Sequence, residues 1–203
     1  NQGFFGYIYG GTVKNLPIAG AITNHQSTGN NSGILCGYLN SGTIRNCFIT
    51  QVVGSNFHSP SRISAITGRN LGFICGTNHY GRIVRCQTDM TQIENATYTH
   101  GSCFGGICGY NDFGTIDSCR SHLAVNPGVT IDTVRGIVGY NHNGILVADT
   151  SYNNSYNKSI MSYVGCIVGY SNGTQSEIRS CYVDEQSRIP SHGNYIGGVV
   201  GKM

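Results

Sequence analysis

The stretch GGICGYNDFGTIDSC, residues 105–119, shows the pattern that decides the fold of this chain. Short pieces rich in β-branched residues alternate with Gly, Asn and Asp, and the unit ends on a cysteine. No run of helix-forming residues occurs within it. The pattern predicts a strand, a tight turn and a second strand.

Variants of this unit recur along all 203 residues. When they are aligned on the glycine that precedes the tyrosine, here called the anchor, the anchors are Gly6, Gly37, Gly76, Gly109, Gly139, Gly169 and Gly201. Their spacings are 31, 39, 33, 30, 30 and 32 residues, and the longest reflects an expanded third coil around residues 50–71. A nearly constant period in this range indicates a solenoid or another repeat array.

The composition indicates which kind of array this is. The chain has 30 glycines, 13 tyrosines and only 4 prolines, and it lacks the Ala-, Leu-, Glu- and Lys-rich runs of helical repeats. Propeller blades need about 40–50 residues, more than most of these units contain. We therefore predict an all-β parallel β-helix (β-solenoid) with coils of about 30 residues and three short strands per coil. It forms a single domain, 1–203, of six coils plus a partial seventh; a sandwich of antiparallel strands is the alternative.

Stacked coils turn the alignment into columns of equivalent residues. Two columns are apolar and are expected to face the interior: one lies two residues before the anchor, and the other lies seven residues after it, from Val13 to Leu146. Ile178 joins the second column if the sixth coil carries a two-residue insertion. The glycines five residues past the anchor, such as Gly114, are expected to supply the positive φ of a tight corner.

These units resemble the GLUG repeat, whose pattern is GG-apolar-apolar-G-x-N-x-G-x-I-x-x-C-x. The resemblance covers essentially the whole chain, with Asp149 in place of the pattern's cysteine as one departure and the long third coil as another. GLUG repeats occur in bacterial surface adhesins, in immunoglobulin A1 metallopeptidases and in large secreted proteins of bacteria and protists. The resemblance implies a secreted or surface-displayed β-solenoid, and it transfers no catalytic residue.

The composition argues against nucleic-acid binding and against a membrane span. Only 10% of the residues are charged, the net charge is +3, and the basic residues are scattered, which argues against a nucleic-acid-binding role. No apolar run approaches the ~18 residues of a membrane span. The abundant Ser, Thr, Asn and Gly are common on extracellular and cell-surface proteins.

Nine cysteines occur, mostly at two repeat positions: just before the anchor and ten residues after it. Coils two to four have both, coils one and five have neither, and in coil six the first is displaced by two residues. This co-occurrence favours disulfides within each coil, with a column of buried thiols as the alternative and zinc as a less favoured one. The predicted pairs are Cys36–Cys47, Cys75–Cys86, Cys108–Cys119 and Cys166–Cys181, with Cys103 left over.

Three residues past the anchor, the column Asn40, His79, Asp112 and His142 places an aspartate between two histidines. It could hold a divalent cation, but polar residues are also the default at an exposed turn, so we predict no metal site and no cofactor. The other carboxylates fall at different repeat positions, as catalytic carboxylates would not. We therefore predict no catalytic residues and no enzymatic activity.

Two further sets of residues are candidate surface features. The position just after the anchor is a column of tyrosines interrupted by Thr77: Tyr7, Tyr38, Tyr110, Tyr140 and Tyr170. This column is a possible ligand face for glycans or a surface receptor. Stacking between coils is the more ordinary role of such tyrosines. Possible N-glycosylation sequons begin at Asn30, Asn95, Asn153, Asn157 and Asn172.

The expected function is that of a non-enzymatic extracellular structural or adhesive protein. Open end coils expose unpaired backbone groups, and no capping segment is evident in the sequence, so head-to-tail self-association in a filament or long fibrous surface protein is expected. The alternative is a glycan- or receptor-binding module of an adhesin, using the tyrosine column and the segment 55–70.

Overall fold

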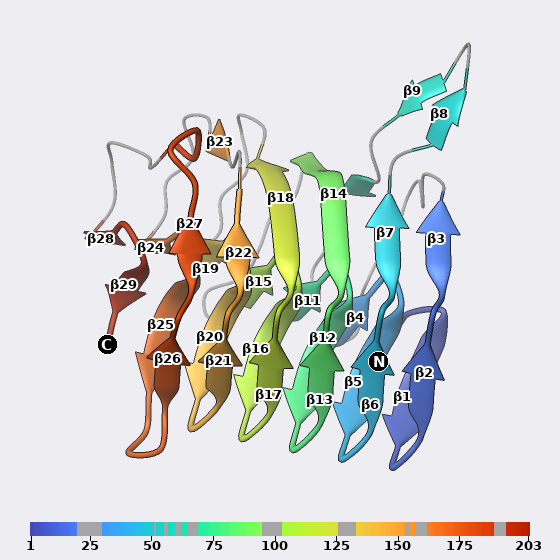
Figure 1. Cartoon of the computed structure of the whole chain (residues 1–203), viewed down its shortest axis with the longest axis horizontal. Coiled ribbons are helices and arrows are strands. Elements are labelled where there is room, and N and C mark those ends of the chain that lie inside the picture. Colours follow the sequence, from blue (N-terminus) through green and yellow to red (C-terminus); the bar gives the residue numbers. More distant parts are fainter. Residues whose placement is uncertain are drawn as a thin grey trace.

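The computed structural model describes residues 1–19, 30–50, 52–54, 57–59, 62–64, 69–94, 103–125, 133–152, 155–156, 162–188 and 194–203. All regular structure in these ranges is β-strand, and every strand pair is parallel except the hairpin β8 (Val52–Gly54) with β9 (Phe57–Ser59). The strands stack in register into a parallel β-helix, as predicted (Figure 1).

The second coil shows how each turn of the solenoid is built. Its strands are β4 (Asn31–Gly33), β5 (Cys36–Asn40), β6 (Thr43–Arg45) and β7 (Phe48–Thr50). Four strands therefore replace the three predicted per coil. Ile34 and Leu35, which bend the chain between β4 and β5, are buried. In the sequence, these residues continue into the apolar segment of β5 and look like part of one strand. In the structure, the backbone bends at Ile34 and Leu35.

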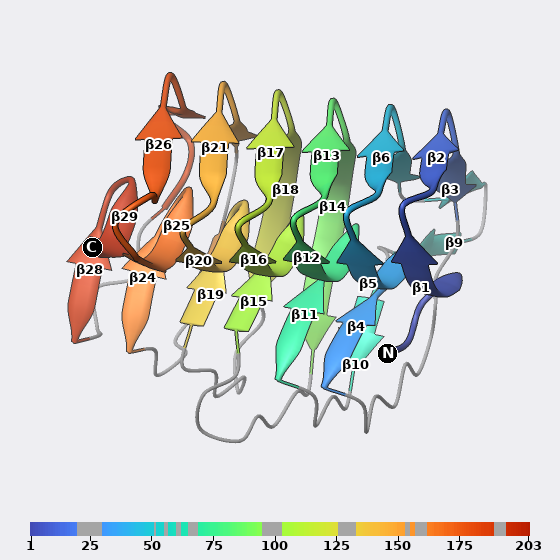
Figure 2. The ribbon, with the colours of Figure 1, turned by 90° about the horizontal axis from the view of Figure 1, so that it is seen from below.

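Equivalent strands form four parallel sheets that run the length of the solenoid (Figure 2). The first sheet contains β1 (Phe5–Tyr9), β5, β12 (Cys75–His79), β16 (Cys108–Asp112), β20 (Val138–His142), β25 (Val168–Asn172) and β29 (Val200–Lys202). The second contains β2 (Thr12–Lys14), β6, β13 (Arg82–Val84), β17 (Thr115–Asp117), β21 (Ile145–Val147) and β26 (Glu177–Arg179).

The third sheet contains β4, β11 (Asn70–Gly72), β15 (Cys103–Gly105), β19 (Thr133–Arg135), β24 (Tyr163–Gly165) and β28 (Tyr195–Gly197). The fourth contains β3 (Pro17–Ala19), β7, β14 (Gln87–Glu94), β18 (Arg120–Val125), β22 (Thr150–Ser151) and β27 (Tyr182–Val183). In addition, β10 (Arg62–Ser64) pairs with β14, and β23 (Ser155–Tyr156) pairs with β18.

The apolar columns form the core between the sheets. Leu35, Ile74 and Ile107 of the first predicted column are fully buried, and so are Ile44, Ile83 and Ile116 of the second. Ile178 of the sixth coil pairs with Leu146 of the fifth coil, which confirms the predicted two-residue insertion. Removing such ladders from water is the main favourable term in folding.

The corners differ from the sequence prediction. Of the predicted glycines, Gly173 has positive φ, whereas in the other coils positive φ occurs one residue earlier than expected, as at Tyr80 and Phe113, and again at a second corner that includes Ser118. The predicted glycine at the following position has another role. A Cβ on Gly114 would lie 2.1 Å from the Asn78 side-chain nitrogen, so the glycine is required by close packing and not by its φ.

Within the described ranges, no helix is long and apolar enough to cross a membrane.

Candidate functional site

The outward face of the first sheet carries the two columns that the sequence singled out. In β16, for example, Tyr110 and Asp112 are partly exposed, whereas Asn111 between them is buried. The strand register aligns Tyr110 with Tyr140 and Asp112 with His142. The tyrosine column and the His/Asp column therefore run side by side along the solenoid.

The tyrosine rings stack on one another along this face. Ring centroids lie 5.5 Å apart for Tyr7 and Tyr38, and 5.0 Å apart both for Tyr110 with Tyr140 and for Tyr140 with Tyr170. Thr77 separates the two stacks. Burial raises the pKa of the Tyr110 phenol to about 12.

This stacking limits what the tyrosine column can bind. Both faces of Tyr140 are covered by neighbouring rings, with interplanar angles of 27° and 5°. A sugar that packs on an aromatic ring needs an uncovered face. The interior of the column therefore offers ring edges and phenol oxygens, and its stacking contributes cross-coil cohesion.

Beside the tyrosines, Asp112 bridges two histidines. Its carboxylate oxygens lie 2.7 Å from Nδ1 of His79 and 2.7 Å from Nδ1 of His142. Both imidazoles are about one-third exposed, and the His142 Nε2 lies 3.1 Å from the Asn143 side-chain amide. The sequence placed these residues in one column, and the structure brings them into direct contact.

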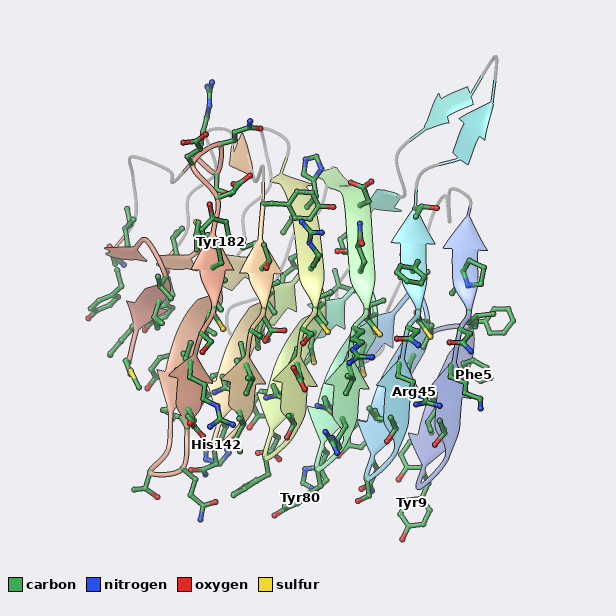
Figure 3. The ribbon with its side chains drawn as sticks, in the orientation of Figure 1. Phe5, Tyr9, Arg45, Tyr80, His142 and Tyr182 are labelled. Atoms are coloured by element: carbon green, nitrogen blue, oxygen red, sulfur yellow. The ribbon has the colours of Figure 1, made fainter. Side chains whose placement is uncertain are left out.

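Two corner aromatics that the sequence reasoning missed flank this triplet. Tyr80 stacks on Phe113 with centroids 5.0 Å apart, and His79 packs edge-on against Tyr80 at 4.5 Å. Tyr80 is 54% exposed and lies, with His142, along the same corner edge of the solenoid (Figure 3). The available signal was the aromatic pair at the position after the His/Asp column.

A second polar cluster lies on the fourth sheet. The Tyr152 hydroxyl donates to Asp89 Oδ1 at 3.2 Å, His122 Nδ1 lies 3.3 Å from the same oxygen, and Arg120 packs over the Tyr152 ring. Burial, with the Asp89 charge nearby, raises the pKa of Tyr152 to about 12. The sequence analysis did not single out this cluster, although Asp89, His122 and Tyr152 share one repeat column, thirteen residues after the anchor.

No metal centre emerges from the described residues: none of their His, Cys, Asp and Glu side chains gather in a group of three or more that could hold an ion. In the His79–Asp112–His142 triplet, the Nδ1 atoms and the carboxylate oxygens are already engaged with one another.

The cysteines differ from the prediction in their neighbours. Two columns of three thiols are buried in the core: Cys36, Cys75 and Cys108, and Cys47, Cys86 and Cys119. All six are free thiols, as is Cys181, so the four predicted disulfides within coils are not formed. Each thiol instead neighbours the same repeat position in the adjacent coil. Co-occurrence within a coil showed that the positions are coupled, but it could not show which sulfurs face each other.

The surroundings of Cys75 and Cys47 suppress the ionisation of these two thiols. Burial, followed by hydrogen bonds with the thiols of Cys108 and Cys36, raises the pKa of Cys75. A hydrogen bond with Cys86, followed by burial, raises the pKa of Cys47. These thiols are therefore packing groups with little thiolate character in the folded chain.

Asp149 replaces cysteine in the second thiol column. Its side chain is fully buried, Oδ1 accepts the backbone N–H of Cys119 at 2.8 Å, and Oδ2 has no hydrogen-bond partner. Burial raises the pKa of this carboxyl to about 8. The sequence showed the substitution but not its depth in the core.

A buried asparagine ladder was also missed. Asn78 donates to Asn111 and Asn111 donates to Asn141, both at 2.8 Å, and Asn141 continues the chain to Ser171 at 3.3 Å. Each asparagine also donates to the carbonyl of the corner glycine three residues later, such as Gly114. The signal was the Asn that follows Tyr or Thr in three successive repeats.

The remaining predicted surface residues are only partly described. Asn30 is exposed immediately before β4, whereas Asn172 lies within β25 and is partly buried. Asn95, Asn153 and Asn157 lie outside the described residues, as does much of the segment 55–70. Glycan occupancy stays a prediction.

Comparisons of the chain with protein-family models, with curated proteins and with solved structures found no match.

Proposed function

We propose that this chain is a non-enzymatic structural or adhesive β-solenoid, secreted or displayed at a cell surface, whose coils stack head-to-tail on further solenoid coils in a filament or long fibrous protein. The resemblance to GLUG repeats of surface proteins supports this proposal. The low charge of the surface supports it as well, since little opposes edge-to-edge pairing.

The observation that carries the proposal is the open state of the end strands. In the chain as it stands, β1 and β29 are the outermost strands of the first sheet, each with one neighbour. Apolar side chains are exposed on these end coils, with Phe4 71% and Val199 44% accessible, while their column equivalents inside are fully buried. A further coil would cover both the backbone edge and these side chains.

The direction of the backbone hydrogen bonds between coils suggests a test of head-to-tail stacking. The N–H of Thr43 donates to the carbonyl of Gly11 in the preceding coil, and the N–H of Arg82 donates likewise to Gly42. By equivalence, the N–H of Thr12 points out of the first coil. Thr12→Pro removes a donor at the open edge without removing a bond between coils of the same chain.

We expect the chain to form linear assemblies that lengthen with concentration in negative-stain electron microscopy, and Thr12→Pro to remain short or monomeric. Thr43→Pro is the matched interior substitution and should lower stability instead, because it removes an existing 2.8 Å bond. A wild-type chain that stays monomeric at high concentration would contradict the proposal.

A second candidate function is recognition of a glycan or surface receptor. The specific observation is the exposed edge formed by Tyr80, Phe113 and the His79–Asp112–His142 triplet, which combines aromatic surface with polar groups as ligand sites do. A glycan array with the purified chain tests it. Binding that Tyr80→Ala removes and Tyr7→Ala retains would favour this edge, and the absence of any saturable hit would count against glycan recognition.

A further inference from the structure

The two thiol columns place cysteines of adjacent coils beside one another. Cys75 is the register partner of Cys36 on one side and of Cys108 on the other. In the second column the backbone N–H of Gln87 donates to the Cys47 carbonyl, and that of Arg120 donates to the Cys86 carbonyl. Both columns therefore run straight along the solenoid, one cysteine per coil.

The spacing of these columns suits disulfides between coils. Paired parallel strands lie about 4.8 Å apart, and disulfides join Cα atoms roughly 4.4–6.8 Å apart. The strand register places Cys75 directly opposite Cys36 in one adjacent coil and opposite Cys108 in the other. The outer cysteines of a column are two spacings apart, roughly 9.6 Å, and are out of range.

We propose that each column forms one disulfide between adjacent coils, with the central cysteine, Cys75 or Cys86, as an obligatory member. Its partner is either neighbour, because a column of three thiols can make only one bond. Each bond fastens coil three to coil two or to coil four.

The bond forms by thiol–disulfide exchange while the coils are stacking, before burial removes the thiolates. One cysteine thiolate attacks oxidised glutathione and releases one glutathione thiolate. The second cysteine then displaces the other glutathione, so two thiols and one glutathione disulfide become one protein disulfide and two glutathione thiols. The inference does not depend on the function proposed above.

The test is refolding of the reduced chain from denaturant with oxidised glutathione, followed by thiol titration in denaturant and non-reducing peptide mapping. The wild-type chain should lose four thiols, and the cross-linked peptides should join adjacent coils. Cys75→Val should lose only two, whereas Cys36→Val and Cys108→Val should each still lose four. Valine is a matched replacement because Val138 and Val168 occupy this column in the next coils.

A second variant guards against misfolding of Cys75→Val. The double variant Cys36→Val/Cys108→Val keeps Cys75 but leaves it without a partner in its column, so it should also lose only two thiols. Circular dichroism under reducing conditions checks that each variant folds. Peptides that join Cys36 to Cys47 or Cys75 to Cys86, an unchanged thiol count in the wild type, or a four-thiol loss in Cys75→Val would each overturn the inference.

Discussion

At the scale of single residues, Asp149 makes the stability of the fold depend on pH. Its folded pKa of about 8 lies above the unfolded value near 3.9. Its contribution to stability is therefore fully present below pH 3.9 and is lost as pH rises toward 8, because the unfolded chain ionises first. The slope approaches about 1.4 kcal/mol per pH unit in that window.

We expect Asp149→Cys, which restores the residue of the neighbouring coils, to flatten this dependence. The variant should gain most over the wild type at pH 8 and least at pH 5, measured as the free energy of unfolding in urea. Glu177→Gln alters an exposed carboxylate and serves as the control. Parallel pH profiles for wild type and Asp149→Cys would show that Asp149 ionises as freely in the folded chain as in the unfolded one.

The corner glycines lead to a second prediction at this scale. A Cβ on Gly114 would lie 2.1 Å from Asn78 Nδ2 and 2.5 Å from Asn111 Oδ1, whereas one on Gly11, at the same corner of the first coil, meets nothing closer than 3.7 Å. Gly114→Ala should therefore cost about 1–3 kcal/mol through overpacking. Gly11→Ala should be neutral or stabilising by about 0.4–1 kcal/mol. Thermal melts of the two variants compare the same substitution in two settings, and equal losses would mean that crowding is not the cause.

At the scale of elements, the asparagine ladder joins three coils through the first sheet. Asn111→Leu removes the donor to Asn141 Oδ1, which leaves that buried acceptor unpaired at a cost of about 1–3 kcal/mol. Leucine fits the column, since Leu39 occupies it in the second coil. Ser171→Ala, at the end of the ladder, should cost less because Asn141 keeps its bond to Gly144. Urea titrations measure both, and equal costs would contradict a cooperative ladder.

The strands also show which features of the fold the sequence could predict. The repeat period predicted strand columns that the register confirms, such as Leu146 with Ile178, because columns follow from alignment alone. It did not place the bend at Ile34 and Leu35, the positive φ at Tyr80, or the sulfur neighbours of Cys75. Those depend on where the backbone turns within a coil, and a period contains no information about that.

For the candidate site, too, the alignment predicted which residues share a column but not the contacts between them. The column containing His79, Asp112 and His142 was predicted from the alignment, and its hydrogen bonds were not, because they depend on rotamers. The Asp89–Tyr152 cluster was missed although its members share one repeat column, because that column has an aspartate, a histidine and a tyrosine in successive coils and so shows no common residue type. Stacking between rings was weighed as the ordinary role of the tyrosines, and the structure shows it in both halves of the column.

At the scale of the whole molecule, the strands lie across the axis along which the coils stack. If the proposed head-to-tail stacking occurs, oriented fibres should therefore diffract at about 4.8 Å along the fibre axis, the spacing of hydrogen-bonded strands. Fibre X-ray diffraction measures this directly. A 4.8 Å reflection perpendicular to the fibre axis would instead indicate that the solenoids associate side by side.

The parallel register also has a mechanical consequence. Partners in adjacent coils, such as Tyr110 and Tyr140, are 30 residues apart in the chain but only one strand spacing apart along the axis. When a coil detaches under tension, the folded solenoid becomes shorter by about 4.8 Å. The detached coil releases up to roughly 100 Å of extended chain. Since each coil contacts chiefly its neighbours, detachment proceeds from an end, one coil at a time. A tether built in this way lengthens in steps under force, because the terminal coils unfold one after another. The interior coils stay folded while this happens.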